Sequence, residues 1–397
     1  MNLKVVTATA SAAVLATLCL VRPAYAEDAS DAPMHPPFKL SVAETVDFLH
    51  NTTGGVSVGS GVDNLVAVAA TLDGENAGLP GFRAHVEIFN STEGTFSAER
   101  SGDIQIVSNI EAPRSTRLFA AWAEKTFGTA VIRAGLMDVN VDFDSIEPAG
   151  LFLNSSHGIG MDIAQTGPSI YPVSALGVRG IWSPSESFTV RAAVFDGVSG
   201  DPNFSHDFVR VRLKGEDGAL VIGEADLKLG KDYQLSVGGW GYTASFDAID
   251  PLLSPQQGQA GVYASIQGPV PLGPGWSGWL RYGIADSHVN VVGSYFGAGL
   301  VKKGPIPLPG RGEDKVGIAI ARASIGGPAR RIMDLSTAET SLEATYSFQA
   351  ASFLTLQPDV QYIIHPASAP NLKNAFVVGL RVALSLSTPA GTFDDED

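Results

Sequence analysis

Apolar and polar residues alternate with a period of two along much of this chain. Residues 82–89 place arginine, histidine and glutamate between apolar side chains, and residues 341–349 place serine, threonine, glutamate and glutamine there. Residues 375–386 alternate again, with Arg381 on the face opposite the large apolar side chains. Successive side chains of a β-strand point to opposite faces, so the pattern predicts strands with one apolar and one polar face. The predicted fold class is all-β.

The length of these strands and the charges on them favour a transmembrane antiparallel β-barrel. The apolar faces persist for about ten residues, the length that a tilted membrane-spanning strand requires, and the opposite faces carry charges. After residue 26 no run of 18 or more apolar residues predicts a spanning helix. Closure into a barrel pairs every strand edge, as the hydrocarbon layer demands. Alternation alone leaves a soluble β-sandwich as an alternative.

The first 26 residues have the composition of an export signal. Lys4 gives a positive start, an apolar stretch follows over residues 5–21, and residues 24–26 read Ala-Tyr-Ala, a typical cleavage site. A membrane anchor and a lipoprotein site at Cys19 are the alternatives. Cleavage after Ala26 removes Cys19, the single cysteine of the chain, so the mature protein is predicted to have no disulfide and no thiolate chemistry.

The charge balance excludes one class of partner. The chain has 26 basic and 41 acidic residues, and loss of Lys4 and Arg22 with the signal takes the net charge from −15 to −17. Phosphates need a basic footprint, so nucleic acid is not an expected partner.

The 44 glycines and 24 prolines suit short strands joined by turns. No linker divides residues 54–386, which are predicted to form one barrel domain, and no cofactor or metal is expected.

The two ends of the mature chain are predicted to lie outside the barrel. Residues 27–53 form an N-terminal leader, in which Ser41 and Glu44 have the spacing of a capping box that opens a short helix through His50. The helix is either a periplasmic segment or a plug. Residues 387–397 form a polar, acidic tail.

Several long phrases resemble one protein family. They are Ser108-Asn109-Ile110-Glu111-Ala112, the ten residues 149–158 (AGLFLNSSHG), Ser169-Ile170-Tyr171-Pro172-Val173, Ala193-Val194-Phe195-Asp196-Gly197 and residues 354–362 (LTLQPDVQY). Together they resemble the carbohydrate-selective porins, the OprB-type family of bacterial outer membranes. The last phrase resembles the penultimate strand of that family.

The resemblance implies a sixteen-stranded, sugar-conducting barrel in the bacterial outer membrane, with carbohydrates and membrane lipids as partners. Alternation by itself identifies most, but not all, of sixteen strands. The acidic tail departs from the family, whose chains usually end on an aromatic residue that closes the last strand. Leu386 is the candidate for that place. Neither the preferred sugar nor the oligomeric state follows from the resemblance.

Three short motifs suggest other chemistry. Residues 55–59 read Gly-Val-Ser-Val-Gly, a hydrolase pattern, but no helix follows as a nucleophile elbow requires. His157 follows two serines, although a catalytic triad needs partners in space. Residues 138–144 begin like a calcium loop, but Phe143 and Ala149 stand where an EF-hand needs glycine and glutamate. A looser calcium site and a solvated acidic loop remain alternatives to an acidic loop at the pore, which we prefer because it follows a strand over residues 130–136.

Side chains on the polar faces are the candidates for lining the pore. Guanidinium groups donate to sugar hydroxyls, carboxylates accept from them, and indole rings can stack on pyranose faces. Valines at 209 and 211 alternate with arginines at 210 and 212, which predicts a strand there. Structural salt bridges within the lumen are the alternative role for each residue. Glu343 and Asp359 are further inward acids. The predicted pore-lining set is Arg83, Glu87, Arg133, Asp138, Asp142, Asp144, Arg191, Arg210, Arg212, Trp240, Trp279, Arg281 and Arg381.

The function predicted from these observations is passive, carbohydrate-selective diffusion into the periplasm. No nucleotide motif or energy-coupling domain is visible, so transport is expected to follow the gradient. A secreted or barrel-borne hydrolase acting on polysaccharide is the alternative, which would need two carboxyl groups about 5–10 Å apart at a cleft. A barrel with an assembly or adhesive role is a third possibility.

Overall fold

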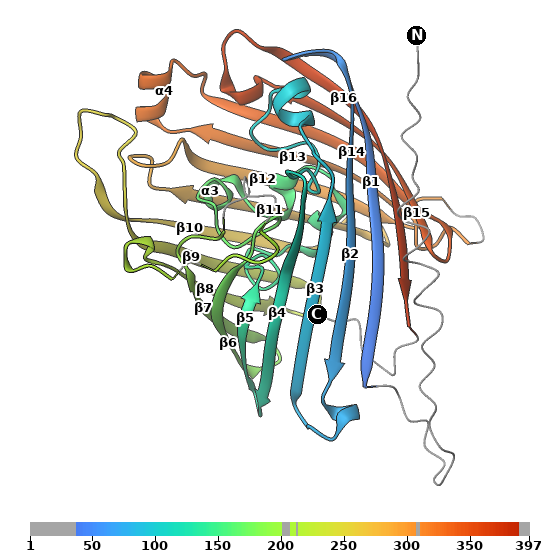
Figure 1. Ribbon diagram of the computed structural model, residues 1–397. Helices are drawn as coiled ribbons and strands as arrows, with labels where there is room; N and C mark the ends of the chain where they lie inside the picture. The colour runs from blue at the N-terminus through green and yellow to red at the C-terminus, as the bar shows by residue number, and fades with distance from the viewer. Residues whose placement is uncertain (1–36, 201–206, 212, 307–309, 389–397) are drawn as a thin grey trace. The chain divides into compact units, whose positions relative to one another are not determined.

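The computed structural model describes residues 37–200, 207–211, 213–306 and 310–388. Within these residues, sixteen antiparallel strands close into one barrel in which β1 pairs with β16 (Figure 1). The all-β barrel prediction is confirmed. The strands are β1 (Phe38–Gly55), β2 (Gly59–Asp73), β3 (Phe82–Ser91), β4 (Ser115–Phe127), β5 (Ala130–Met137), β6 (Ala175–Ser185), β7 (Phe188–Asp196), β8 (Ala219–Leu229), β9 (Tyr233–Phe246), β10 (Gln256–Pro269), β11 (Trp276–Ala285), β12 (Val292–Lys303), β13 (Lys315–Ile325), β14 (Ala338–Ala351), β15 (Leu354–Ile364) and β16 (Lys373–Ser387).

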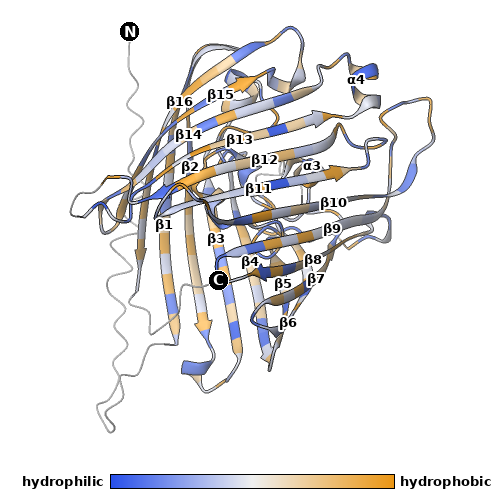
Figure 2. Cartoon of the chain, turned by 180° about the vertical axis from the view of Figure 1, so that it is seen from behind, coloured by the Kyte–Doolittle hydropathy of each residue, from blue (hydrophilic) through white to orange (hydrophobic). Residues whose placement is uncertain are grey.

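The alternation seen in the sequence becomes the two faces of the barrel wall. On β14, Ser341 and Glu343 are buried inside while Leu342 is exposed outside. On β16, Val377 is buried inside while Phe376 and Leu380 are exposed outside. Figure 2 shows the same alternation as bands of hydrophilic and hydrophobic residues along the strands. Apolar side chains therefore face outward, as in a barrel whose outer surface contacts lipid.

The predicted N-terminal helix is wrong. Residues 41–50 lie within β1, which pairs with β2 on one side and β16 on the other. The capping-box spacing of Ser41 and Glu44 is a local preference worth about 1 kcal/mol. Without β1, two strand edges of the barrel would be left unpaired in the membrane, which costs far more. The barrel thus begins at Phe38 rather than residue 54.

The C-terminal boundary is close to the predicted one. Strand β16 ends at Ser387, and the backbone N–H of Thr388 donates to the Leu40 carbonyl oxygen at the start of β1 (3.0 Å). Leu386 is exposed on the outer face and pairs with Val42. Strand β15 coincides with the phrase expected to be the penultimate strand. The predicted signal peptide and most of the predicted acidic tail lie outside the described residues.

The strand predicted around residues 209–212 is also wrong. Described residues 207–211 contain no strand, and β8 begins only at Ala219. A strand needs a neighbouring strand to form a ladder of hydrogen bonds, and four alternating residues do not supply one. The Leu118 N–H of β4 donates to the Phe208 carbonyl oxygen (2.7 Å), but no ladder continues from it in residues 207–211. Arg210 pairs with Asp207 (3.4 Å) in the connection between β7 and β8. Arg212 lies outside the described residues.

The longest connections lie at one end of the barrel. Residues 128–129 join β4 to β5, and residues 186–187 join β6 to β7, whereas residues 92–114 and 138–174 form long loops at the opposite end. Outer-membrane barrels have short periplasmic turns and longer extracellular loops, so the long end is the extracellular one. None of the helices in the described ranges is both long and apolar enough to span a membrane.

The two long loops fold into the barrel and bury apolar side chains against its wall. Loop 92–114 contains the π-helix η3 (Ser97–Ser101); loop 138–174 contains η4 (Glu147–Leu151), α2 (Ser155–Gly158) and α3 (Met161–Ala164). Figure 1 shows α3 within the ring of strands, where it contacts β11 and β12. Ile163 of α3 packs in a buried cluster with Trp240 and Tyr263 of the wall. The lumen is thus partly filled by chain at this level.

Candidate functional site

Loop 138–174 crosses the lumen from β5 to the opposite wall. The backbone N–H groups of Leu153 and Asn154 both donate to the Glu343 carboxylate on β14, at 2.6 and 3.0 Å. The Asn154 amide also donates to the Gln361 side-chain oxygen on β15 (3.2 Å). The Glu343 carboxylate thus accepts hydrogen bonds from two backbone N–H groups of the loop that lie outside regular secondary structure.

The two inserted loops are joined to each other. The Asn109 N–H donates to the Leu153 carbonyl oxygen (2.8 Å), and the Ser155 N–H donates to the Ile106 carbonyl oxygen (3.0 Å). Asn109, Leu153 and Ser155 all belong to the long phrases singled out in the sequence. The phrases at residues 108–112 and 149–158 therefore belong to the inserted loops, which explains why they are not strands.

Asp142 is bound by arginines of the wall. Arg179 on β6 donates to both of its carboxylate oxygens, at 3.0 Å from Nε and 2.8 Å from Nη2. Arg133 on β5 lies 3.5 Å from Asp142 and donates from Nε to Glu124 on β4 (2.8 Å). Asp142 is thus in contact with wall arginines rather than held apart from them, because a close pair compensates the loss of hydration better than two separated charges.

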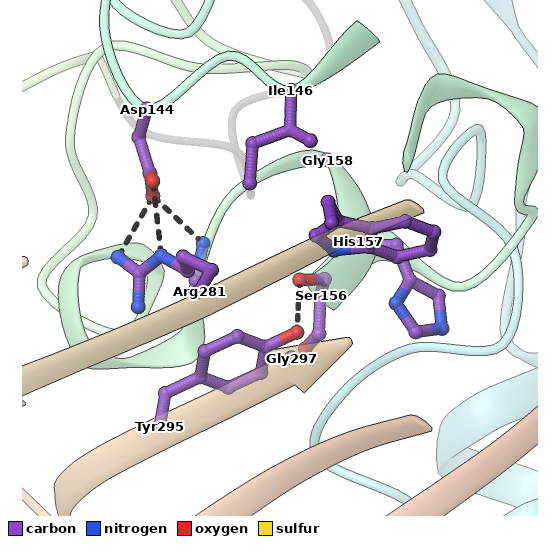
Figure 3. A pocket seen from close by; sticks show the side chains of 10 residues that line it. Asp144, Ile146, Ser156, His157, Gly158, Arg281, Tyr295 and Gly297 are labelled. Atoms are coloured by element: carbon purple, nitrogen blue, oxygen red, sulfur yellow. Dashed lines mark hydrogen bonds and ion pairs between the residues drawn. The ribbon is translucent and has the colours of Figure 1, made fainter. Parts of the chain in front are cut away.

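Asp144 forms a deeply buried ion pair with the wall. It accepts two hydrogen bonds from Arg281 of β11, from Nε at 2.9 Å and Nη2 at 2.8 Å, and both residues are 3% exposed or less (Figure 3). Asp162 of α3 holds the other side of the same guanidinium. Gly160 lies so close that a Cβ there would overlap the Arg281 guanidinium. Arg281 therefore fixes two points of loop 138–174.

The wall between β7 and β10 continues this set of contacts. Arg191 of β7 pairs with Glu224 (2.9 Å) and Asp226 (2.6 Å) of β8. Glu224 also accepts from the Asp144 backbone N–H (2.8 Å) and from the Tyr263 hydroxyl (2.7 Å). We call the groups that join the wall to this loop the anchoring belt: Glu124, Arg133, Asp142, Asp144, Asp162, Arg179, Arg191, Glu224, Asp226, Tyr263 and Arg281.

The anchoring belt contains residues that the sequence reasoning missed. Glu124, Arg179, Glu224 and Asp162 were not among the predicted pore-lining residues, yet each binds one that was. The first three occupy inward positions on strands, so the alternation of residues 175–185 and 219–229 could have identified Arg179 and Glu224. No periodic signal could have identified Asp162, because it lies on a four-residue helix inside the loop.

Loop 92–114 is held by a second group of wall residues. Arg381 of β16 binds Asp47 of β1 through two hydrogen bonds of 2.7 Å and donates to the Asn109 side chain (2.7 Å). Asp47 in turn accepts from the Ser108 hydroxyl (2.6 Å). Glu339 of β14 accepts from the backbone N–H of Ile104 and of Gln105, at 2.9 and 3.0 Å.

The predicted tryptophan faces are covered by protein. Trp240 on β9 is 4% exposed within the cluster that packs against α3, and Trp279 on β11 is 6% exposed against Phe152 of the loop. Neither indole is open to stack on a sugar in this structure. Trp122 on β4, which the prediction missed, also faces inward and is only partly buried. It stacks on His85 with 5.2 Å between centroids and lies under the Arg133 guanidinium at 3.9 Å.

Of the remaining predicted residues, Glu87 keeps part of its side chain exposed, whereas the Asp138 carboxylate is buried. Arg83 and Glu87 occupy inward positions of β3, and the Glu87 side chain is 30% exposed, 3.6 Å from His85. Asp138 lies directly after β5, where its carboxylate accepts from the Asn140 N–H (2.7 Å). Burial raises the pKa of Asp138 to about 7. Burial, and then the negative charge of Asp63, likewise raise the pKa of Glu111 in loop 92–114 to about 7.

The rival motifs have structural partners. Ser57, in the hydrolase-like pattern, lies in the turn between β1 and β2, donates to the Glu99 carbonyl oxygen (2.6 Å) and accepts from Arg100 (2.9 Å). His157 is buried against Phe152 and Trp279, and burial lowers its pKa to about 3. No strand–turn–helix elbow surrounds Ser57 in the described chain. These serine and histidine residues do not form a triad with each other.

The aspartates of residues 138–144 do not converge on one point. Asp138 binds the Asn140 backbone, Asp142 binds Arg179, and Asp144 binds Arg281. Among the described residues, no group of three or more histidine, cysteine or carboxylate side chains is arranged to hold a metal ion. The geometry therefore does not support the looser calcium site.

Comparison with known proteins agrees with the barrel fold. Residues 66–386 match the model of the carbohydrate-selective porin, OprB family. A segment of 117 residues is 26% identical to Porin B of Pseudomonas aeruginosa, and this match spans 25% of the present chain and 25% of Porin B.

Two solved structures illustrate the shared fold. The high-pH structure of Pseudomonas putida OprB superposes with a TM-score of 0.77 at 20% identity, covering 88% of this chain and 94% of that one. The outer-membrane channel DcaP of Acinetobacter baumannii gives a TM-score of 0.55 at 10% identity, covering 88% and 97%. With a family match over most of its length and this architecture, the chain belongs to the carbohydrate-selective porins of the OprB family and is a β-barrel of the bacterial outer membrane.

Proposed function

We propose that this porin admits carbohydrates to the periplasm by passive diffusion, and that the two inserted loops set the width and selectivity of its passage. The observation that carries the proposal is the anchoring belt, in which the buried Arg281 holds Asp144 and Asp162 of loop 138–174 against the wall. A loop held at several points presents a fixed opening, and selectivity in such pores comes from diameter, hydrogen-bonding groups and local field.

The candidate sugar contacts divide into two groups. Asp144, Arg281 and Trp279 are assigned to the support of the loop, because protein covers them. Arg83, Glu87, Arg133 and Arg191 are assigned to the passage, since they lie on inward strand positions, and the last three keep 30%, 11% and 18% of their side chains exposed. Arg133 and Arg191 thus belong to the anchoring belt and also border the passage. Guanidinium and carboxylate groups pair with hydroxyls without requiring a charged solute, which suits neutral sugars.

A channel rather than an enzyme is what the family and fold indicate. The inward carboxylates of the belt are engaged by arginines, and Glu343 by backbone N–H groups. A glycosidase needs one carboxyl group that is free to donate a proton and a second that acts on the sugar or on water. We therefore propose no catalytic role for these acids.

Planar-bilayer recording tests the function. The mature protein is expected to open steady channels whose current falls on addition of mono- or disaccharides to either side. Folded protein that never conducts would contradict the channel, and a current indifferent to every sugar would contradict the selectivity. Release of reducing sugar from a polysaccharide, measured on the same preparation, would instead support the hydrolase.

A further inference from the structure

Arg322 is the exception among the strand arginines. Of the eight arginines on described strands, seven occupy inward positions. Arg322 on β13 lies between Ala321 and Ala323, which are both completely buried inside the barrel, so its own side chain is on the outer face, where it is exposed. Its Nη1 donates to the Thr340 hydroxyl of β14 (3.0 Å). Among the described residues, no carboxylate within 4 Å is recorded for it.

The free-energy cost of an outward-facing arginine depends on its depth in the membrane. It lies three residues before the end of β13, at the end of the barrel that carries the long loops. An arginine on the lipid face costs about 2–4 kcal/mol at the midplane and only about 0–1 kcal/mol near an interface. Arg322 is therefore at the level of the headgroups of the outer leaflet, where phosphate groups are available.

An apolar groove begins directly below this guanidinium on the same face. It has a volume of about 670 Å³ and runs across β12 to β16. Arg322 of β13 pairs with Thr340 of β14. At the next outward position deeper in the wall, Leu342 of β14 lies between Ile320 of β13 and Tyr362 of β15. Small side chains deepen it at Ala298 and Ala344. Its outward walls are Ile318, Ile320, Leu342, Val360, Tyr362 and Phe376.

We propose that this groove binds one acyl chain of a phosphate-bearing lipid, with the lipid phosphate on Arg322. An apolar trough with a cation at its interfacial end matches the two halves of such an amphiphile. The guanidinium offers a planar fork of donors that fits phosphate oxygens. Arg330 and Arg331, both exposed on α4 (Gly327–Met333) in the loop after β13, add positive charge at that end, offset in part by Asp334.

Native mass spectrometry of the purified mature porin in detergent tests the site. The probes are dimyristoyl phosphatidate, dimyristoylglycerol, which lacks only the phosphate, and inorganic phosphate, which lacks the chains. The wild type is expected to retain one phosphatidate, with affinity about tenfold above that for dimyristoylglycerol, the effect expected of a charge-assisted hydrogen bond. Inorganic phosphate at equal concentration is not expected to compete.

Variants separate the headgroup from the groove. Arg322→Gln is expected to lose the preference for phosphatidate, while Arg322→Lys retains most of it. Lys302→Gln is the matched control, because Lys302 is an outward cation at the other end of the adjacent β12, bound to the Pro274 carbonyl oxygen. Ala344→Phe fills the groove and is expected to weaken both lipids equally.

Three outcomes would overturn the proposal. One is equal phosphatidate binding by the wild type and Arg322→Gln, with both folded by their heat-dependent mobility in gels. Another is full displacement of phosphatidate by inorganic phosphate at equal concentration. Binding would then depend on the phosphate group alone and not on the acyl chains in the groove. The third is a dimer mass that Arg322→Gln abolishes, since this would identify the face as a contact between two copies. If Arg322→Gln does not fold, Ala344→Phe still decides whether the groove is occupied, with Lys302→Gln as the control variant.

Discussion

At the scale of single residues, buried charge is what holds the inserted loops. The Arg281 guanidinium is almost completely buried and its two partners, Asp144 and Asp162, come from points 18 residues apart on one loop. Replacement of such a pair by apolar groups can be neutral, but removal of one partner leaves an uncompensated charge. The loss of stability on substitution therefore depends on whether a buried charge is left unpaired, more than on the strength of the original ion pair.

Asp144→Asn is expected to loosen loop 138–174. Loss of one partner of a buried pair costs about 3–5 kcal/mol, although Asp162 remains to share Arg281 and lowers this figure. The expected result is a lower unfolding temperature in detergent together with larger and noisier single-channel currents. Asp286→Asn is the control, since this aspartate pairs with His288, whose ring is exposed, in the loop that follows β11. Unchanged currents would mean that Asp144 does not position the loop.

Arg381→Gln is expected to be harmful, although Arg381 lies on the lumenal face, where polar side chains are usual. The substitution leaves the Asp47 carboxylate without its arginine partner. Asp47 is 0% exposed and accepts two hydrogen bonds from that arginine. The double variant Asp47→Asn with Arg381→Gln is expected to be more stable than Arg381→Gln alone, because it removes the unpaired charge. Denaturant unfolding of all four forms measures the coupling, and strict additivity would contradict it.

The pKa of Glu111 predicts a pH-dependent stability. Burial raises this pKa from 4.5 to about 7, so the folded protein holds its proton more tightly than the unfolded chain does. The resulting stabilisation is complete below about pH 4 and is lost as the pH rises through 7, with a size on the order of 3 kcal/mol. Glu111→Gln is expected to flatten the fall in unfolding temperature between pH 5 and 8. An identical slope in the variant and the wild type would assign the dependence to other groups.

At the scale of elements, β1 is the strand that closes the barrel. Its inward residues Asp47, Leu49 and Asn51 are buried, while Phe48 between them is exposed. The alternation is therefore present, but in a segment that also reads as a capped helix. Pairing with β16 resolves the ambiguity, because only an extended segment can satisfy the edges of both β16 and β2.

A cross-link tests that closure. Thr45 and Ala383 are direct partners in the β1–β16 ladder. Opposite residues of antiparallel strands have Cα atoms roughly 4.5–5.5 Å apart, within the range for a disulfide. Thr45→Cys with Ala383→Cys is expected to form an intramolecular disulfide in the folded porin, detected by faster migration in non-reducing gels. Thr45→Cys with Ser385→Cys, displaced along the strand, is the control. Equal cross-linking of the two pairs would contradict this register.

At the scale of the whole molecule, the barrel and the inserted loops have different roles. Strand pairing closes the wall without the loops, whereas the loops bury side chains from β1, β9, β11 and β16 that would otherwise line open water. The passage is accordingly the space that the loops leave, rather than the width of the barrel.

Replacement of residues 145–164 by a short Gly-Ser linker is expected to raise conductance severalfold and to abolish block by sugars. The barrel itself is expected to assemble, since no strand pair is touched. Bilayer recording measures both effects, and a matched replacement in the short turn around η2 (Glu75–Ala77) is the control. Wild-type conductance after the deletion would place the narrowest point elsewhere.

The sequence by itself determined most of the strands, their two faces and the family, because alternation is a property of neighbouring residues and the long phrases are read directly. Arg133, Arg191, Arg281 and Arg381 were assigned to the inner face in this way, and all four lie there. Tertiary structure alone decided what these side chains bind. Asp144 and Arg281 are 137 residues apart, and Asp47 and Arg381 are 334 apart. No local pattern relates such positions, and the same long-range packing turned a capped segment into β1 and covered the faces of Trp240 and Trp279.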